Sequence, residues 1–320
     1  MKLIINMPAY NEAKSIGKTI RAIPRSFDGI SEVLIQVVDD GSRDGTADAA
    51  REAGADIVVV HKTNRRLGIA FNSAVRSALE NGADIMVNID ADGQFDPQQI
   101  GAMLKPILDG DADMTIGDRF KAGKANGIPL IKKVLNKFAA KLVGAFLNVE
   151  IHDLTCGFRA HNREALLRLN TVIGFTYTQE TIIDAIGKNL KLTWVPVTVQ
   201  YFEGRKSRVV LGVWNFVNNS AKIIIKAIRD VRPMKFFGIP GLFVVLLSVL
   251  VFILFLALYL PELQITPYRN YLLVSIVLFF VGMQFLVFAL IADMIKTNRQ
   301  LTEETMYRMR KQKYNFKVIL

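Results

Sequence analysis

Two long uncharged apolar runs constrain this chain more than any other feature of its sequence. Residues 236–260 (FFGIPGLFVVLLSVLVFILFLALYL) and 271–292 (YLLVSIVLFFVGMQFLVFALIA) contain no Asp, Glu, Lys or Arg. As an α-helix, the first run would be roughly 37 Å long, which is enough to cross a bilayer. Two buried helices of a soluble core or a re-entrant hairpin are the alternatives, but uncharged runs of this length are rare in soluble cores. The sequence therefore predicts two membrane-spanning helices joined by a short loop.

The basic residues around these two runs predict their orientation in the membrane. The loop between the runs contains a single basic residue, Arg269. The flanks contain many more, namely Lys222, Lys226, Arg229, Arg232 and Lys235 before the first run and Lys296, Arg299, Arg308, Arg310, Lys311 and Lys313 after the second. Because Lys and Arg accumulate on the cytoplasmic side of membrane proteins, we expect both flanks in the cytosol. The sequence thus predicts a multi-pass protein of the cell membrane with a large cytosolic N-terminal domain.

The net charge of +11 is unevenly distributed along the chain. Residues 1–208 contain 27 Lys and Arg against 24 Asp and Glu, whereas residues 209–320 contain 13 against 5, so their net charges are +3 and +8. A basic excess next to apolar runs indicates anionic lipid, and not nucleic acid, as the partner. The single cysteine, Cys156, rules out an intrachain disulfide, and the apolar run at the N-terminus is too short for a signal peptide.

Residues 1–208 have the pattern of an α/β domain. Apolar runs of strand length lie at 2–7, 33–38, 56–60, 84–90 and 112–117. Helical patterns lie between them, near 12–23, 44–53, 69–81 and 97–108. Strands that alternate with crossover helices form a parallel sheet, and such sheets bind their ligands at the carboxyl ends of the strands. The functional residues are therefore expected at that edge.

Polar clusters follow three of the predicted strands: PAYNE (8–12), DDGSRDGT (39–46) and DADGQ (90–94). A lone D-x-D often ends a strand in an ordinary turn, because Asp bonds to nearby backbone N–H groups. Three such clusters on one edge are harder to explain in this way. The absence of G-x-G-x-x-G after the first strand and of a P-loop lysine argues against a dinucleotide or ATP site. Two carboxylates at a strand end, Asp90 and Asp92, suit a hard cation that also holds a diphosphate.

These motifs, in this order and spacing, resemble those of the family 2 glycosyltransferases with the GT-A fold. IGDRF (116–120) and DLTCGFRA (153–160) are similar to the polyprenyl-phosphate glycosyltransferases of the dolichol-phosphate-mannose-synthase type. The resemblance covers about residues 3–208, and the paired C-terminal helices resemble those of membrane-bound members. It implies an α/β GT-A nucleotide-sugar-binding domain, Rossmann-like in architecture, followed by a C-terminal two-helix transmembrane hairpin.

The resemblance assigns roles to individual residues. The donor nucleotide sugar would be held by Pro8, Tyr10, Glu12, Asp39, Asp40, Asp90, Ala91 and Asp92. The ligands of Mg²⁺ or Mn²⁺ would be Asp90, Asp92 and Gln94. Arg119 would meet the donor phosphates, so the expected catalytic residues are Asp90, Asp92 and Arg119. A divalent cation suits the reaction because it neutralises charge on the departing diphosphate without proton transfer.

Five other residues are singled out with less specific roles. Asp44 lies in the second motif and can cap the helix that follows. Asp153 and Arg159 follow the family pattern, whereas Cys156 replaces its usual Ser and is expected to be a small buried residue, not a nucleophile. Glu180 could orient a group at the site, although a carboxylate on a helix face often has no such role.

A basic amphipathic segment is the expected docking site of a lipid acceptor. No Asp or Glu lies between Arg119 and Val149, and apolar residues within 130–147 recur at helical spacing beside lysines. This pattern predicts a helix at the membrane surface, with a helix packed on the domain and a solvated lysine face as the alternative. The acceptor phosphate would contact Arg119, Lys132, Lys133, Arg205 and Arg208. The last two lie in EGRKSR (203–208), where Phe202 stands in place of an Arg that the family often has.

Together, these features predict a membrane-bound inverting glycosyltransferase that moves a hexose from a nucleotide sugar to polyprenyl (dolichyl) phosphate. GDP-mannose, UDP-glucose and UDP-GlcNAc all fit as donors, and the product would serve cell-envelope or protein glycosylation. A phosphate monoester needs no general base, since its second pKa is about 6. The alternatives are a glycosyltransferase with another acceptor (a polysaccharide or a lipid), a sugar nucleotidyltransferase, and a non-catalytic membrane adaptor on a GT-A fold.

The predicted segments follow from these assignments. A cytosolic GT-A catalytic domain covers 1–208, and an interfacial amphipathic helix lies within 209–235. Two transmembrane helices cover 236–260 and 271–292, and a basic cytosolic tail covers 293–320. The expected partners are the nucleotide sugar, the polyprenyl phosphate and the lipid bilayer, without nucleic acid, and the short hairpin is compatible with a homo-oligomer.

Overall fold

The computed structural model describes residues 1–121, 130–170, 177–200, 213–263 and 265–316. The chain divides into two compact units, Met1–Ile225 with Glu303–Leu320, and Lys226–Thr302. Three residues predicted to contact the acceptor are affected by these limits. Arg205 and Arg208 lie outside the described residues, and so does the side chain of Lys132.

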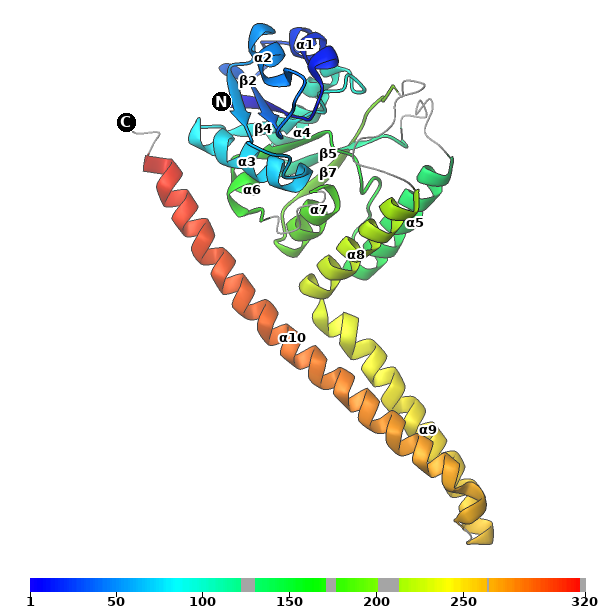
Figure 1. Cartoon of the computed structure of the whole chain (residues 1–320). Coiled ribbons are helices and arrows are strands. Elements are labelled where there is room, and N and C mark those ends of the chain that lie inside the picture. Colours follow the sequence, from blue (N-terminus) through cyan, green and yellow to red (C-terminus); the bar gives the residue numbers. More distant parts are fainter. Residues whose placement is uncertain (122–129, 171–176, 201–212, 264, 317–320) are drawn as a thin grey trace. The chain divides into compact units, whose positions relative to one another are not determined.

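The first unit is built on a mixed β-sheet, in which the described strands are ordered β3-β2-β1-β4-β6-β5-β7 (Figure 1). These are β1 (Lys2–Ala9), β2 (Glu32–Asp39), β3 (Ile57–Val60), β4 (Ile85–Asn88), β5 (Met114–Asp118), β6 (Arg159–Asn162) and β7 (Leu192–Pro196). All five strands predicted from apolar runs are present. The expectation of a parallel sheet is wrong at one position, because β6 runs antiparallel between β4 and β5. Its sequence, RAHN, is too short and polar to be recognised as a strand.

Helices lie between the strands along the chain, and the last helix named here follows the final strand and continues past residue 225, where the second unit begins. They are α1 (Ala13–Ala22), α2 (Thr46–Glu52), α3 (Leu67–Glu80), η1 (Pro97–Gln99), α4 (Ile100–Leu108), α5 (Leu130–Leu147), α6 (Arg163–Arg168), α7 (Thr178–Gly187) and α8 (Val213–Val231). The helices predicted between the first five strands correspond to α1 through α4. A core cluster packs α3 against the sheet through the buried side chains of Ile4, Val38, Phe71, Ala74 and Met86. Each large apolar side chain contributes roughly 1.5–3 kcal/mol on burial, which stabilises the strands that carry the site.

Two candidate membrane spans lie in the C-terminal part of the chain, Met234–Pro261 and Thr266–Asn315, identified by length and composition. Their elements are η2 (Met234–Gly238, π-helical), α9 (Ile239–Glu262), η3 (Thr266–Tyr268, a 3₁₀ turn) and α10 (Arg269–Phe316). Both apolar runs found in the sequence are therefore helical. The second helix continues well beyond residue 292, where the apolar pattern ends. The stretch that connects the runs has Glu262 and Arg269 as its charged residues.

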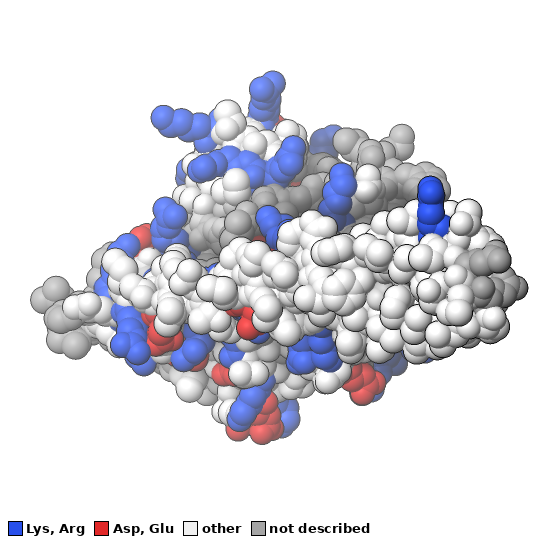
Figure 2. Space-filling model, turned by 90° about the horizontal axis from the view of Figure 1, so that it is seen from below, with Lys and Arg blue, Asp and Glu red and all other residues white. Residues whose placement is uncertain are grey.

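Many apolar side chains of these helices are highly exposed. Contact of so many of them with water would be unfavourable. Phe243 and Phe280 are each 66% exposed, and Leu250 is 63% exposed. Figure 2 shows a broad area of the surface without charged side chains. A surface of this kind is suited to lipid contact. Within the second unit, α9 and α10 approach closely at a glycine, since a Cβ atom at Gly282 would lie 2.8 Å from the backbone N of Val245.

The last part of α10 belongs to the first unit and packs on α6. The Tyr307 hydroxyl donates to Glu164 Oε2 over 3.1 Å. Arg310 Nη1 donates to the backbone carbonyls of Leu167 and Leu169, over 3.1 and 3.2 Å, where α6 ends. These bonds satisfy carbonyls that the end of a helix leaves unpaired. The basic tail predicted after the second span is thus helical over most of its length, and part of it is packed.

Candidate active site at the carboxyl edge of the sheet

The motifs found in the sequence meet at one edge of the sheet. β1 and β2 are parallel, with Ala9 opposite Asp39 at their ends. β4 runs parallel to β1 on its other side, so the D-x-D motif follows at the same edge. Near the end of β5, Gly117 N donates to Phe158 O over 2.9 Å, which brings the loop before β6 to this edge as well. The polar clusters therefore surround one region, as their positions at strand ends predict.

Side chains tie the loop after β1 to the loop after β2. Asn11 N donates to Ser42 Oγ over 2.8 Å, and Arg43 N donates to Asn11 Oδ1 over 2.9 Å. Glu12 N donates to Thr46 Oγ1 over 2.8 Å. Asn11 has a φ of 55°, in the left-handed region that Asn tolerates better than most residues. The two loops thus form one preorganised surface.

Two aspartates of the second motif have distinct surroundings. Asp39 is 3% exposed and accepts a hydrogen bond from Ser42 N over 2.9 Å. Asp44 accepts from Ala13 N and Thr46 N, at 3.1 Å each, where α1 and α2 begin. Burial alone would raise the pKa of Asp44, but hydrogen bonds from Thr46 and Ala13 hold it below its usual value. Asp44 therefore contacts the first N–H of the following helix, as predicted, although Gly45 occupies the N-cap position, and it also contacts the start of α1, which was not predicted.

Asp40 holds the loop between β3 and α3. Its Oδ1 accepts from His61 Nδ1 over 2.7 Å and from Arg65 N over 2.9 Å. His61 Nε2 in turn lies 2.9 Å from Ser73 Oγ on α3. The sequence did not indicate this role, because the partners lie 21 and 25 residues further along the chain. The predicted contact of Asp40 with the donor stays a prediction.

The D-x-D carboxylates stand directly after β4. Asp92 Oδ1 accepts from Gln94 N over 2.9 Å, and Gly93 between them has a φ of 72°. Asp90 lies against the backbone of Gly157, where an added Cβ atom would be 3.2 and 3.3 Å from the two carboxylate oxygens. A side chain at position 157 would therefore press on the Asp90 carboxylate.

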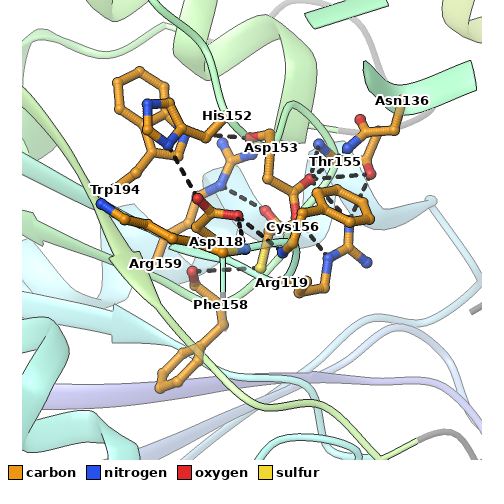
Figure 3. A network of polar contacts seen from close by, with 12 residues as sticks. Asp118, Arg119, Asn136, His152, Asp153, Thr155, Cys156, Phe158, Arg159 and Trp194 are labelled. Atoms are coloured by element: carbon orange, nitrogen blue, oxygen red, sulfur yellow. Dashed lines mark hydrogen bonds and ion pairs between the residues drawn. The ribbon is translucent and has the colours of Figure 1, made fainter. Parts of the chain in front are cut away.

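A buried ion pair joins the IGDRF motif to the DLTCGFRA motif (Figure 3). Arg119 Nε and Nη2 donate to the two oxygens of Asp153 over 2.7 and 2.9 Å, and Nη2 also donates to Thr155 Oγ1 over 2.7 Å. Asp153 is fully buried and accepts from Asn136 Nδ2 of α5 over 3.0 Å. Burial alone would raise the pKa of Asp153, but the Arg119 guanidinium and the hydrogen bonds hold it below its usual value. The pair fixes Arg119 at the end of β5.

A histidine and a tryptophan that the sequence did not single out lie side by side on one side of this network (Figure 3). His152 Nδ1 lies 3.0 Å from Asp118 Oδ2, and the His152 ring stacks on Trp194 with centroids 5.4 Å apart. Trp194 Nε1 donates to the Asp153 carbonyl over 3.4 Å. Trp194 comes from β7, which has no motif of its own, so only the fold brings it to the site.

Arg159 and Cys156 are both fully buried next to the site. Arg159 Nε donates to Cys156 O over 2.7 Å, and its Nη1 donates to Thr181 Oγ1 of α7 over 2.6 Å. Burial raises the pKa of Cys156 to about 12, so its thiol stays protonated. The expectation of a small buried cysteine is confirmed.

The sequence profile of the family described as Glycosyl transferase family 2 matches residues 4–169, which is more than half of the chain. The chain belongs to glycosyltransferase family 2. This glycosyltransferase is 32% identical over 211 residues to the polyprenol monophosphomannose synthase of Mycolicibacterium smegmatis, with 62% of the chain and 77% of that protein covered. It is 30% identical over 233 residues to the UDP-N-acetylglucosamine–dolichyl-phosphate N-acetylglucosaminyltransferase of Methanococcus voltae, with 64% of the chain and 90% of that protein covered.

The fold of the glycosyltransferase is also found among solved structures. It matches glucosyl-3-phosphoglycerate synthase from Mycobacterium tuberculosis, in complex with Mn²⁺, UDP and glucosyl-3-phosphoglycerate, with a TM-score of 0.56. The match covers 72% of the chain and 79% of the solved chain at 20% identity, so it concerns the fold alone. The predicted GT-A fold and the class of enzyme are confirmed.

The D-x-D carboxylates of the glycosyltransferase fit a divalent cation by their chemistry. Among the residues that the structure describes, no group of three or more His, Cys, Asp or Glu side chains is placed to hold a metal. Mg²⁺ is often held by only one or two carboxylates and takes its other ligands from water and substrate phosphates. Asp90 and Asp92, both half-buried at the edge of the sheet, match that pattern.

α5 of the glycosyltransferase exposes an apolar stripe along its length. Three side chains at one-turn intervals are 58, 67 and 55% exposed, namely Val134, Phe138 and Leu142. Each follows an exposed lysine, namely Lys133, Lys137 and Lys141. The buried side of the helix includes Asn136, Ala140, Val143 and Leu147. The exposed apolar stripe is what a helix docked at the membrane surface requires, while the buried side and the exposed lysines also agree with a helix packed on the domain, so docking of α5 stays a prediction.

Proposed function

We propose that this glycosyltransferase is a membrane-bound enzyme that transfers a hexose from a nucleotide sugar to a polyprenyl phosphate, with inversion at the sugar carbon. The observation that carries the proposal is the meeting of the D-x-D carboxylates and the Arg119–Asp153 pair at one sheet edge, in a chain with two candidate spans. The names of two relatives, which specify transfer involving polyprenol or dolichyl phosphate, support this class of acceptor. Because those names differ in the sugar, the donor is open between a mannose and an N-acetylglucosamine nucleotide, with UDP-glucose as a third option.

The donor would lie across the tied loops and the D-x-D motif. Its nucleoside would be held by Pro8, Tyr10, Glu12 and Asp39. Asp90, Asp92 and Gln94 would hold Mg²⁺ or Mn²⁺, which when bound neutralises charge on the diphosphate. The guanidinium of Arg119, oriented by Asp153, would add charge-assisted hydrogen bonds to the phosphates.

The acceptor phosphate would act as the nucleophile without a general base. A phosphate monoester has a second pKa of about 6 and is mainly a dianion at pH 7. One of its oxygens attacks the anomeric carbon while the bond from that carbon to the nucleoside diphosphate breaks, so the diphosphate leaves with the bonding electrons. The chain's task is then to align the two reactants. The acceptor phosphate would be held by Lys132, Lys133, Arg205 and Arg208.

The membrane topology is part of the proposal. Two crossings return a chain to the side of the membrane from which it started. The packing of the last part of α10 on α6 supports an even number of crossings. It places the C-terminal segment on the sheet-containing first unit, here called the sheet domain, and so on the same side of the membrane. The basic residues outside the two spans support a cytosolic position of that domain.

The test is a transfer assay with the purified full chain in detergent. Short polyprenyl phosphate, Mg²⁺ or Mn²⁺, and a panel of GDP- and UDP-sugars are supplied, and released nucleoside diphosphate and glycosylated lipid are followed together. The expected result is metal-dependent release that is matched by glycosylated lipid phosphate for one donor. Release without a lipid product would indicate another acceptor, and no release with any donor would favour the non-catalytic adaptor.

A further inference from the structure

A row of buried polar side chains crosses the centre of the sheet below the D-x-D motif. Asn6 on β1 pairs in register with Gln36 on β2 and with Asn88 on β4. Asn88 in turn stands opposite Arg159 on β6. All four side chains are fully buried. Such positions in a covered sheet are usually apolar, and a buried polar side chain requires hydrogen-bond partners.

The hydrogen bonds of this row lead from β2 to the loop beside Asp90. Gln36 Nε2 donates to Asn6 Oδ1 over 2.9 Å, and Asn6 Nδ2 donates to Asn88 Oδ1 over 2.6 Å. Asn88 Nδ2 donates to the Tyr177 hydroxyl over 2.6 Å. Tyr177 donates to the carbonyl of Gly157 over 3.0 Å, and Asn88 Nδ2 also reaches this carbonyl over 3.2 Å, so the hydroxyl supplies the shorter of two bonds to it. The row therefore ends on the backbone of the DLTCGFRA motif.

The ring of Tyr177 is held in place by its neighbours. It is 1% exposed and lies parallel to the ring of Phe71 on α3, with centroids 4.1 Å apart. The guanidinium carbon of Arg159 lies 5.7 Å from the centroid of the Tyr177 ring. With the ring fixed in this way, the hydroxyl has a defined position, and so does the carbonyl that it binds.

Gly157 is the point at which this row reaches the candidate active site. A Cβ atom at Gly157 would lie 3.2 and 3.3 Å from the oxygens of Asp90 and 3.6 Å from the Tyr177 hydroxyl. The Gly157 backbone is thus packed between the hydroxyl and the carboxylate. A shift of a few tenths of an ångström in this backbone would change the space in which the carboxylate can turn. Metal ligands must be held within about 0.5 Å of their productive positions.

We propose that Tyr177 is a positioning residue for Asp90. Its hydroxyl, held by Asn88, fixes Gly157 against the Asp90 carboxylate and thereby orients that carboxylate toward Mg²⁺ or Mn²⁺. The inference rests on the proposed function, because it takes Asp90 as a metal ligand. Partners that orient metal ligands typically change metal affinity 10- to 100-fold when they are removed. A purely structural role of Tyr177 would instead change stability and leave metal affinity unaltered.

Two variants act on this arrangement in different ways. Tyr177→Phe removes the hydroxyl and keeps the ring against Phe71. Gly157→Ala removes no hydrogen bond and adds a methyl group against the Asp90 carboxylate. Thr115→Val is the matched control, since Thr115 is a fully buried residue of β5 whose hydroxyl donates to the carbonyl of Met103 over 2.8 Å.

The measurement is Mn²⁺ binding to the full chain in detergent, followed by the electron paramagnetic resonance signal of free Mn²⁺. Each variant is titrated with saturating UDP and, separately, with saturating GDP, and its thermal unfolding is recorded. We expect Tyr177→Phe to weaken Mn²⁺ binding about tenfold or more. Gly157→Ala should also weaken Mn²⁺ binding, and Thr115→Val should bind Mn²⁺ about as tightly as the wild type. Excess Mn²⁺ should restore most of the transfer activity of Tyr177→Phe.

The outcomes separate this inference from the function on which it rests. If the wild type binds Mn²⁺ and Tyr177→Phe binds it within twofold of the wild type, Tyr177 does not position the ligand. An equal loss of affinity in Thr115→Val would also overturn the inference, because it would reflect general loosening of the sheet. If the wild type binds no Mn²⁺ with either nucleotide, the metal assignment of Asp90 fails first, and the inference fails with it.

Discussion

At the residue scale, the candidate site depends on polar groups that are buried and paired. Asp153 is fully buried, and both of its oxygens contact the Arg119 guanidinium. Removing two charges from water costs several kcal/mol, which an ion pair offsets only with good geometry and further hydrogen bonds. Asn136 and Thr155 supply those bonds. Substitutions in the site should therefore be most destabilising where the removed side chain leaves a buried partner without its hydrogen bond or ion pair.

Replacement of a single carboxylate tests the metal assignment. Asp92→Asn keeps the size of the side chain and an oxygen that can accept from Gln94 N, but it removes the charge that a divalent cation requires. We expect metal-dependent transfer to fall by at least about 100-fold while the thermal unfolding midpoint stays near that of the wild type. The transfer assay and a melting curve measure the two effects, and near-normal turnover would contradict the assignment.

A buried histidine predicts how stability depends on pH. Burial, and next the charge of Arg159, lower the pKa of His161 from 6.5 to about 3. Between these values the unfolded chain binds a proton that the folded chain does not, so stability is complete above about pH 6.5 and falls as the pH decreases toward 3. The slope of the free energy of unfolding against pH approaches about 1.4 kcal/mol per pH unit. Denaturant unfolding between pH 6.5 and 5 should show a flatter dependence for His161→Phe, and an unchanged slope would rule out His161 as its source.

At the element scale, α5 presents two kinds of residue along its exposed side. Its exposed lysines form one row and its exposed apolar residues form a second row beside it, because adjacent residues of a helix point about 100° apart. A helix of this composition can bind a surface that is apolar inside and anionic outside. A polyprenyl phosphate in a bilayer has both properties.

Neutralising lysines of α5 should weaken binding of the lipid acceptor more than binding of the nucleotide-sugar donor. In the combined variant Lys132→Gln and Lys133→Gln, we expect KM for polyprenyl phosphate to rise on the order of fivefold per lysine, from about 1 kcal/mol per basic residue near an anionic surface. KM for the nucleotide sugar should change little. Lys105→Gln, which alters an exposed lysine of α4, is the control. Equal increases in both KM values would indicate that the lysines only face solvent.

The end of α10 should stabilise the sheet domain through one arginine. Arg310 donates to two carbonyls at the end of α6, whereas Arg308, on the same helix, has a side chain that is 77% exposed. We expect Arg310→Ala to lower the free energy of unfolding by about 1.5–3 kcal/mol, since a hydrogen bond to a charged group contributes that much. Arg308→Ala should change it little. Comparable melting curves for the two variants would show that the contact does not stabilise the domain.

The sequence predicted the elements with strong local patterns and missed those that depend on distant contacts. The strands β1 to β5 have apolar runs bounded by polar turns, so their positions follow from local sequence. β6 and β7 are short and gain their places from neighbours, and β6 could not be identified as antiparallel without the fold. The same holds at the site: the D-x-D motif is a local signal, whereas the pairing of Arg119 with Asp153 joins residues 34 positions apart.

At the scale of the whole molecule, the proposed topology can be mapped with single cysteines. The native cysteine should give little background labelling, because Cys156 is fully buried and its thiol stays protonated. A membrane-impermeant maleimide should label Leu263→Cys, a residue that is 70% exposed beyond α9, in intact cells. Arg308→Cys should be labelled only after lysis. The reverse pattern would invert the orientation, and labelling of both from one side would contradict two crossings.

The stretch between the two apolar runs has a consequence for how the protein enters a membrane. Its charged residues are one acid and one base, Glu262 and Arg269, so its net charge is zero. Under the proposed topology, this is the hydrophilic segment that must pass through the bilayer when the hairpin inserts. Each charge moved across a potential of 100 mV gains or loses about 2.3 kcal/mol, and here the two contributions cancel. Insertion would therefore involve no net electrical work and would proceed equally in energised and de-energised membranes.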